Sequence, residues 1–151
     1  MTDAVKNYLR RVMNIDKEIN SKMNTAGSMR SSLTSIGATR WKENDVQESR
    51  TKTAEDKMAE YLDMESEVDK RIDDLIKLKR KIMNEIERVD DRLHRIVLTE
   101  RYINNSSWCA VAELLQYKSE RQAHNLHGSA LQDFYESNKK EIKEYMEQIV
   151  E

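Results

Sequence analysis

Apolar residues recur at steps of three and four between residues 3 and 36, and this period predicts one long amphipathic helix. A helix of that length would extend roughly 50 Å, which is farther than a small globular domain needs. We therefore expect it to pair with a second helix. The apolar stripe consists of Val5, Leu9, Val12, Ile15, Ile19, Met23, Ala26, Met29, Leu33 and Ile36.

A second helical pattern follows a polar interval. Gly37 is expected to end the first helix, and residues 37–53 are expected to form a loop around Trp41 because they show no sustained period. Two charged residues, Glu65 and Lys79, occupy the second stripe. Either Met64 and Leu78 replace them as the stripe drifts around the helix, or they control the register as buried polar groups. The apolar positions of this stripe are Met58, Tyr61, Val68, Ile72, Leu75, Ile82, Ile86, Val89, Leu93 and Ile96.

Two stripes of similar length predict an antiparallel helical hairpin over residues 1–91. Such a hairpin has a thin core and often associates with a second copy. We expect a coiled-coil oligomerisation region and a homodimer or higher homo-oligomer. The pattern leaves open whether the hairpin forms within one chain or is swapped between two.

The pattern changes to three short helices over residues 92–138, followed by a helical tail over residues 139–151. The first short helix is expected to end near Ile103, before a polar break at residues 104–106. Ser107 and Ser119 can each cap the helix that follows through the side-chain oxygen. The second helix then covers residues 108–115, residues 116–118 turn the chain, and the third helix begins. This spacing is typical of a helix-turn-helix.

The helix-turn-helix needs a small residue where its two helices cross, and Ala112 suits that place. The surrounding core is expected to contain Val111, Leu115, Leu126 and Leu131, with Leu98, Tyr102 and Ile103 from the preceding helix. The third helix has a further apolar face of Ala123, Leu126, Ala130, Leu131 and Phe134. Its outward residues and the turn before it are the candidate DNA-binding set, which consists of Lys118, Ser119, Glu120, Arg121, Gln122, His124 and Asn125.

Within this set, Arg121 is the strongest candidate for contact with a base. A guanidinium can bond a guanine edge at two atoms, and the amides of Gln122 and Asn125 suit adenine. Residues 94–138 carry four positive and five negative side chains. Phosphate neutralisation supplies most non-specific affinity, so this segment needs a dimer, a protein partner or further basic residues. The sequence offers one such basic stretch in Lys77, Lys79, Arg80 and Lys81.

The composition favours an all-α, non-enzymatic, cytoplasmic protein. Proline is absent, glycine occurs three times, and charged residues make up 36% of the chain. The single cysteine, Cys109, has no internal partner and is expected to be an inert packing residue. His124 and His127 lack companion ligands for a metal, and no catalytic or cofactor motif is recognisable, so we expect neither metal nor cofactor. No apolar run approaches the roughly 20 residues that a membrane span needs.

The C-terminal segment carries a signature made of residues 101–103, Trp108, 121–122 and 126–131, and the stretch YLRRVMNIDKEINSKM precedes it near the N-terminus. Through these residues the chain resembles region 4 of sigma-70-type factors, and more closely the phage and prophage regulators of the ArpU/RinA type. The turn at residues 115–119 is one residue longer than the usual sigma-type turn. The resemblance implies a transcription regulator in a bacterial host cytoplasm, with double-stranded DNA and host RNA polymerase as partners.

Two other functions also fit these patterns. A DNA-packaging protein of the small-terminase kind also joins a helix-turn-helix to an oligomerising helical part, and would form rings of about eight or more subunits. A coiled-coil adaptor would use its C-terminal domain to bind protein only.

Overall fold

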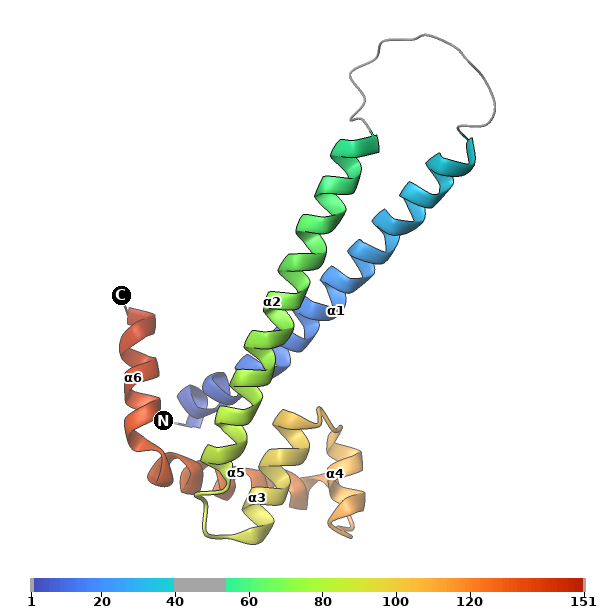
Figure 1. The fold of residues 1–151 in the computed structure, drawn as a ribbon. Helices are drawn as coiled ribbons and strands as arrows, with labels where there is room; N and C mark the ends of the chain where they lie inside the picture. The colour runs from blue at the N-terminus through green and yellow to red at the C-terminus, as the bar shows by residue number, and fades with distance from the viewer. Residues whose placement is uncertain (1, 40–53, 151) are drawn as a thin grey trace. The chain divides into compact units, whose positions relative to one another are not determined.

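The computed structural model describes residues 2–39 and 54–150, and all regular structure in these residues is helical (Figure 1). The predicted all-α class is therefore confirmed. Most of the predicted loop, including Trp41, lies outside the described residues. In chain order the helices are α1 (Thr2–Thr39), α2 (Ala54–Ile86), α3 (Arg92–Leu98), the π-helical turn η1 (Thr99–Ile103), α4 (Trp108–Leu114), α5 (Glu120–Ser137) and α6 (Lys139–Val150).

The chain divides into two compact units, which we call the core unit and the hairpin unit. The core unit combines Met1–Ile15 with Leu75–Glu151, and the hairpin unit is Asp16–Asp74. This division differs from the expected boundary between residues 91 and 92. The first turns of α1 and the last turns of α2 belong with the short helices because their apolar side chains are buried in the same core.

The hairpin unit pairs α1 and α2 in antiparallel directions. Lys22 contacts Glu67 at 2.8 Å, and Glu18 contacts Arg71 at 3.4 Å. The residue number falls along α1 as it rises along α2, which is the pairing of antiparallel helices. Among the residues of this unit whose burial the structure describes, the buried apolar ones are Ile19 and Val68, so this part of the core is thin, as expected. Helix α1 continues through Gly37 to Thr39, so the prediction that Gly37 ends it is wrong. A mid-helix glycine costs only about 1 kcal/mol, which a long helix tolerates.

The second apolar stripe drifts around its helix, and the helix itself stops at Ile86. Glu65 is exposed beside a half-buried Met64, and Leu78 is buried, so the drift interpretation is favoured over buried polar register control. The extension of the stripe through Leu93 is wrong, because residues 87–91 turn the chain and Leu93 is 45% exposed. Asp91 caps the new helix α3 by accepting a hydrogen bond from the His94 amide at 2.9 Å.

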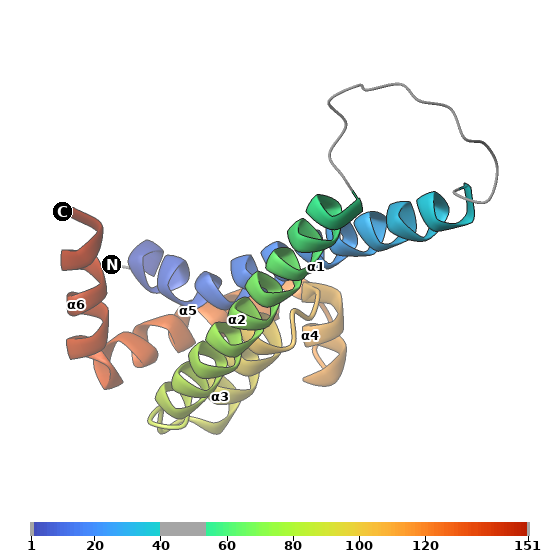
Figure 2. The same ribbon diagram turned by 45° about the horizontal axis from the view of Figure 1, so that its top comes forward.

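The core unit packs α5 against α3 and α4, and the first turns of α1 lie beside α5 (Figure 2). The ring of Tyr8 lies 6.3 Å from that of Phe134 and 5.2 Å from that of Tyr145. Helix α6 was expected as a tail, yet its Ile142 is fully buried in the same core. The fully buried residues of α1 that enter this core are Val5, Tyr8, Leu9 and Val12.

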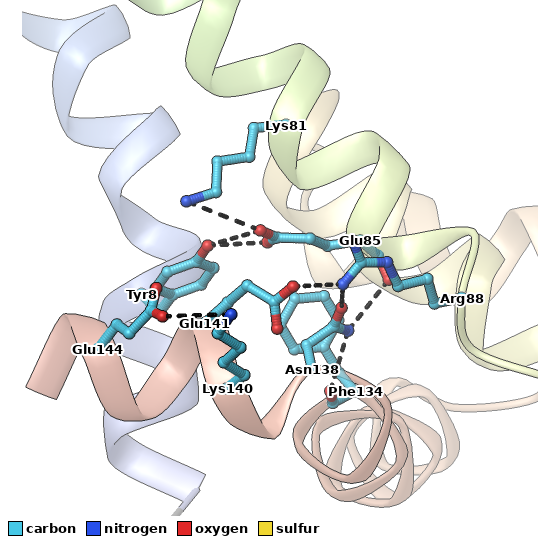
Figure 3. Close-up of polar contacts among 9 residues, drawn as sticks. All are labelled: Tyr8, Lys81, Glu85, Arg88, Phe134, Asn138, Lys140, Glu141 and Glu144. Atoms are coloured by element: carbon cyan, nitrogen blue, oxygen red, sulfur yellow. Dashed lines mark hydrogen bonds and ion pairs between the residues drawn. The ribbon is translucent and has the colours of Figure 1, made fainter.

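A buried polar cluster ties α1, α2 and α5 together (Figure 3). The Tyr8 hydroxyl lies 2.9 and 2.8 Å from the two carboxylate oxygens of Glu85 and donates to them. Burial raises the pKa of Glu85, and burial together with Glu85 raises the pKa of Tyr8. The Asn138 amide donates to the carbonyls of Glu85 and Phe134, each at 3.1 Å, and its oxygen accepts from Arg88. These contacts satisfy polar groups that would otherwise be costly to bury.

No helix in residues 2–39 or 54–150 combines the length and apolar character that crossing a membrane requires.

Candidate nucleic-acid interface

Helix α4 begins as the sequence predicts. Ser107 has an extended backbone, and its hydroxyl oxygen accepts a hydrogen bond from the Ala110 amide at 3.2 Å. This is the N-cap geometry expected for serine. The cap fixes the start of α4 at Trp108.

The turn after α4 is a Schellman motif. The Tyr117 amide donates to the Ala112 carbonyl at 2.8 Å, and the Gln116 amide donates to the Glu113 carbonyl at 3.0 Å. Gln116 takes the left-handed conformation, with φ of 56°, at the position where glycine is usual. The motif ends α4 sharply and redirects the chain into α5.

The start of α5 differs in detail from the prediction. Ser119 occupies the N-cap position, but its side chain makes no capping hydrogen bond. Instead, the side-chain oxygen of Gln122 accepts from the Lys118 amide at 2.9 Å. Gln122 reaches back further than the short serine side chain, so it holds the turn in place of Ser119.

Helix α5 has one buried and one exposed face over its first turns. Ala123, Ala130, Leu131 and Phe134 are buried as predicted, and Leu126 is half-buried. The predicted DNA-binding residues are all exposed, namely Lys118, Ser119, Glu120, Arg121, Gln122, His124 and Asn125. The structure therefore brings the whole predicted set to the surface at one end of α5.

Helix α3 leads into a π-helical turn, where the Asn104 amide donates to the Thr99 carbonyl five residues earlier at 3.1 Å. The sequence predicted only a helix ending near Ile103, because a π turn has no distinct periodicity. Within this turn, Arg101 donates to the Ser106 carbonyl at 2.8 Å. Its guanidinium carbon also lies 4.8 Å from the centre of the Trp108 ring, in a cation–π contact.

The two histidines of α5 have different surroundings. The His124 residue is exposed, and the centre of its ring lies 4.0 Å from that of Trp108. His127 is buried, and its Nε2 lies 2.9 Å from the Tyr102 hydroxyl. Nothing lies within 4 Å of where a Cβ of Gly128 would be, so this glycine next to His127 does not serve a close approach of two helices. Among the described residues, no three His, Cys, Asp or Glu side chains are placed to share a metal ion.

Cys109 is exposed, so the expectation that it packs into the core is wrong. It immediately follows Trp108 on a short helix, and only one face of that helix meets the core. Val111 and Ala112 occupy that face.

Burial of His127 predicts a pH-dependent stability. Burial lowers its pKa from 6.5 to about 4, so the unfolded chain takes up a proton first. Stability from the neutral imidazole is therefore complete above pH 6.5 and is lost as pH falls towards 4. Relative to His127→Gln, the wild type should lose about 2–3 kcal/mol of unfolding free energy over this range. Urea unfolding at pH 7, 5.5 and 4 measures this difference.

The comparison with His127→Gln cancels the titration of groups that both proteins share, including the raised pKa of Glu85, which acts in the opposite direction. Parallel profiles of wild type and variant would mean that His127 is not held neutral by the fold.

The fold also brings Lys6 and Arg10 of α1 to a pocket beside α5, which the sequence did not predict. Arg101, Trp108 and His124 line the same pocket. Lys6 and His124 are more than a hundred positions apart in the chain, and a periodicity within one helix carries no information about such a pairing. The only hint in the sequence was the charge deficit of residues 94–138.

Residues 35–130 match a family described as protein of unknown function (DUF1492). This segment runs from the last turns of α1 through α4 and into the middle of α5. No curated protein and no solved structure matches the chain. Because the match covers more than half of its residues, the chain belongs to the DUF1492 family.

Proposed function

We propose that this protein is a phage or prophage transcription regulator that binds double-stranded DNA through the N-terminal half of α5. The observation that carries the proposal is the division of α5 into a buried apolar face and an exposed polar end that follows a tight turn. A recognition helix uses such an end in the major groove. The resemblance to sigma region 4 and to ArpU/RinA-type regulators supports the transcriptional role, with host RNA polymerase as a protein partner.

The proposal gives different roles to neighbouring side chains. Arg121 and Asn125 are exposed and carry the groups that pair with guanine and adenine edges. The side-chain oxygen of Gln122 already accepts a hydrogen bond from the Lys118 amide, so Gln122 positions the turn. Lys118 is exposed in the turn before α5, and the proposal assigns it to contact with phosphate.

We further propose that the protein acts as a homodimer through its hairpin unit. Three large apolar residues of this unit, Met23, Met58 and Leu62, are about half exposed, and a second copy would cover them. A dimer presents two recognition helices to two half-sites and doubles the number of phosphate contacts.

Replacing Arg121 should weaken sequence-specific binding while leaving the fold intact. Arg121 is exposed, so Arg121→Ala removes no core packing. We expect a loss of about 1–3 kcal/mol in binding to the preferred duplex, with relaxed selectivity at one base pair. Selection of duplexes from a random library defines the site, and fluorescence anisotropy at several salt concentrations measures the affinity.

The matched control is Arg92→Ala, an exposed arginine on α3 that removes the same charge. It should leave base selectivity unchanged. Equal selectivity of the Arg121→Ala protein and wild type would remove Arg121 as a base contact. Failure of the wild type to enrich any duplex would overturn the DNA-binding function and favour an adaptor that binds only protein.

A further inference from the structure

A basic pocket lies at the side of α5 within the core unit. It encloses about 190 Å³ and is lined by residues of α1, η1, α4 and α5. Its positive side chains are Lys6, Arg10 and Arg101, and no acidic side chain belongs to its lining. A concave surface with only one sign of charge attracts an anion, because its low-dielectric walls focus the field.

The charge of this pocket is only weakly compensated. Lys6 contacts Asp3 at 3.6 Å, but the Asp3 side chain is 91% exposed, so solvent screens the pair. Arg101 is held by a neutral carbonyl and the Trp108 ring. Arg10 is exposed and forms no ion pair with any part of the chain that the structure describes. Three cations therefore remain available to one ligand.

Two of the other polar groups of the pocket, His127 and Tyr102, add no charge of either sign at neutral pH. Burial lowers the pKa of His127 to about 4 and raises the pKa of Tyr102 to about 12, so both side chains are neutral at pH 7. The Tyr102 hydroxyl and the Nε2 atom of His127 are hydrogen-bonded to each other at 2.9 Å. The positive charge that lines the pocket thus comes from Lys6, Arg10 and Arg101.

His124 connects the pocket to the exposed end of α5. It lines the pocket and stacks on Trp108, and it follows Arg121 by one helical turn and precedes Asn125. An anion in this pocket would therefore lie next to the side chains proposed to contact bases. When a helix contacts bases in a groove of the duplex, the anions that flank this helix are the phosphates of the DNA backbone.

Resting on the DNA-binding function proposed above, we propose that this pocket holds one backbone phosphate of the bound duplex, with Lys6, Arg10 and Arg101 as its cationic partners. The N-terminal turns of α1 then supply positive charge that residues 94–138 lack, since that segment has four positive and five negative side chains. Phosphate contacts of this kind fix the position of a recognition helix without reading sequence.

The test is the double variant Lys6→Gln/Arg10→Gln of the full chain. One lost phosphate contact should weaken binding about tenfold near 0.1 M salt, and equally for the selected and a random duplex. The slope of log affinity against log salt should become shallower by about 0.9. The matched control, Lys17→Gln/Arg30→Gln, removes the same charges from exposed positions of α1 in the hairpin unit and should change the slope much less.

A second measurement uses the wild-type protein, so it does not depend on how the variant folds. Methylphosphonate groups, which are uncharged, replace the phosphates of the selected duplex one at a time. At one position per half-site the wild type should lose about tenfold in affinity, whereas Lys6→Gln/Arg10→Gln should lose almost nothing further. The charge-preserving variant Lys6→Arg/Arg10→Lys should retain the wild-type salt slope.

The outcomes separate this inference from the function on which it rests. Selective binding that depends on Arg121, combined with an unchanged salt slope in Lys6→Gln/Arg10→Gln, overturns the phosphate site alone. Additive losses at every methylphosphonate position overturn it as well. Absence of binding to any duplex by the wild type overturns both proposals.

Discussion

Leu9→Ala should lower the free energy of unfolding of the core unit by about 2–5 kcal/mol. Leu9 is fully buried and lies in the same core as the short C-terminal helices, although it belongs to α1. Its removal leaves a cavity between the N-terminal turns and the helix-turn-helix, and the buried Tyr8–Glu85 contact lies next to it in the chain. DNA binding by this variant should then decline only because a smaller fraction of the protein is folded, and the folded molecules should bind DNA as the wild type does.

The measurement needs a probe in the core unit. The chain has two tryptophans, Trp41 and Trp108, so a Trp41→Phe background makes Trp108 the only indole reporter. Trp108 contacts His124, His127 and Arg101 and should respond when the unit unfolds.

Leu93→Ala is the matched control, because Leu93 is 45% exposed on α3. It should cost less than about 1 kcal/mol. If both leucine variants unfolded at the same denaturant concentration, the N-terminal turns would not be part of the cooperative unit.

Phe134→Ala is expected to have the largest single-residue effect, about 3–5 kcal/mol. Phe134 is fully buried on α5 and its ring lies 6.3 Å from that of Tyr8. Its carbonyl also accepts a hydrogen bond from Asn138, where α5 gives way to α6. A cavity here disturbs the contacts that α5 makes with α1 and α6 together.

Phe134→Leu serves as the graded control, since it keeps most of the apolar volume and should cost about 1–2 kcal/mol. Urea denaturation followed by Trp108 fluorescence measures both variants. Near-equal stability of Phe134→Ala and wild type would show that α5 is held by other contacts. A loss of stability in Phe134→Leu without one in Phe134→Ala would contradict the prediction, because leucine is smaller than phenylalanine and cannot overpack this site.

Local patterns predicted much of the helix-turn-helix correctly. Ser107 caps α4, the turn lies at residues 115–119, and Ala123 and Leu131 face the core, because each depends on residues only a few positions apart. Predictions from local patterns were wrong where another nearby residue made the capping or turn-stabilising hydrogen bond. Gln122 displaced Ser119 as the group that satisfies the turn, and Asp91 started a new helix inside an apparently continuous stripe.

The candidate site was only half predictable. Arg121 and Asn125 were assigned to the exposed side because the helical period alone decides which face they share. Lys6 and Arg10 could not be assigned, since their place beside α5 depends on how α1 packs in the core unit. Tyr8 and Glu85 were missed for a related reason, because a buried hydrogen-bonded pair breaks the apolar pattern that marks a core.

The amino-acid sequence by itself determined that the described chain is helical, where its helix-turn-helix begins and turns, and which residues α5 exposes. These properties depend on periodicity, capping and turn chemistry within a few residues. Only the tertiary structure decided that the first turns of α1 complete the C-terminal core and that Lys6, Arg10 and Arg101 line one pocket. The physical reason is that burial and electrostatic proximity depend on distances in space, and residues a hundred positions apart carry no shared local pattern.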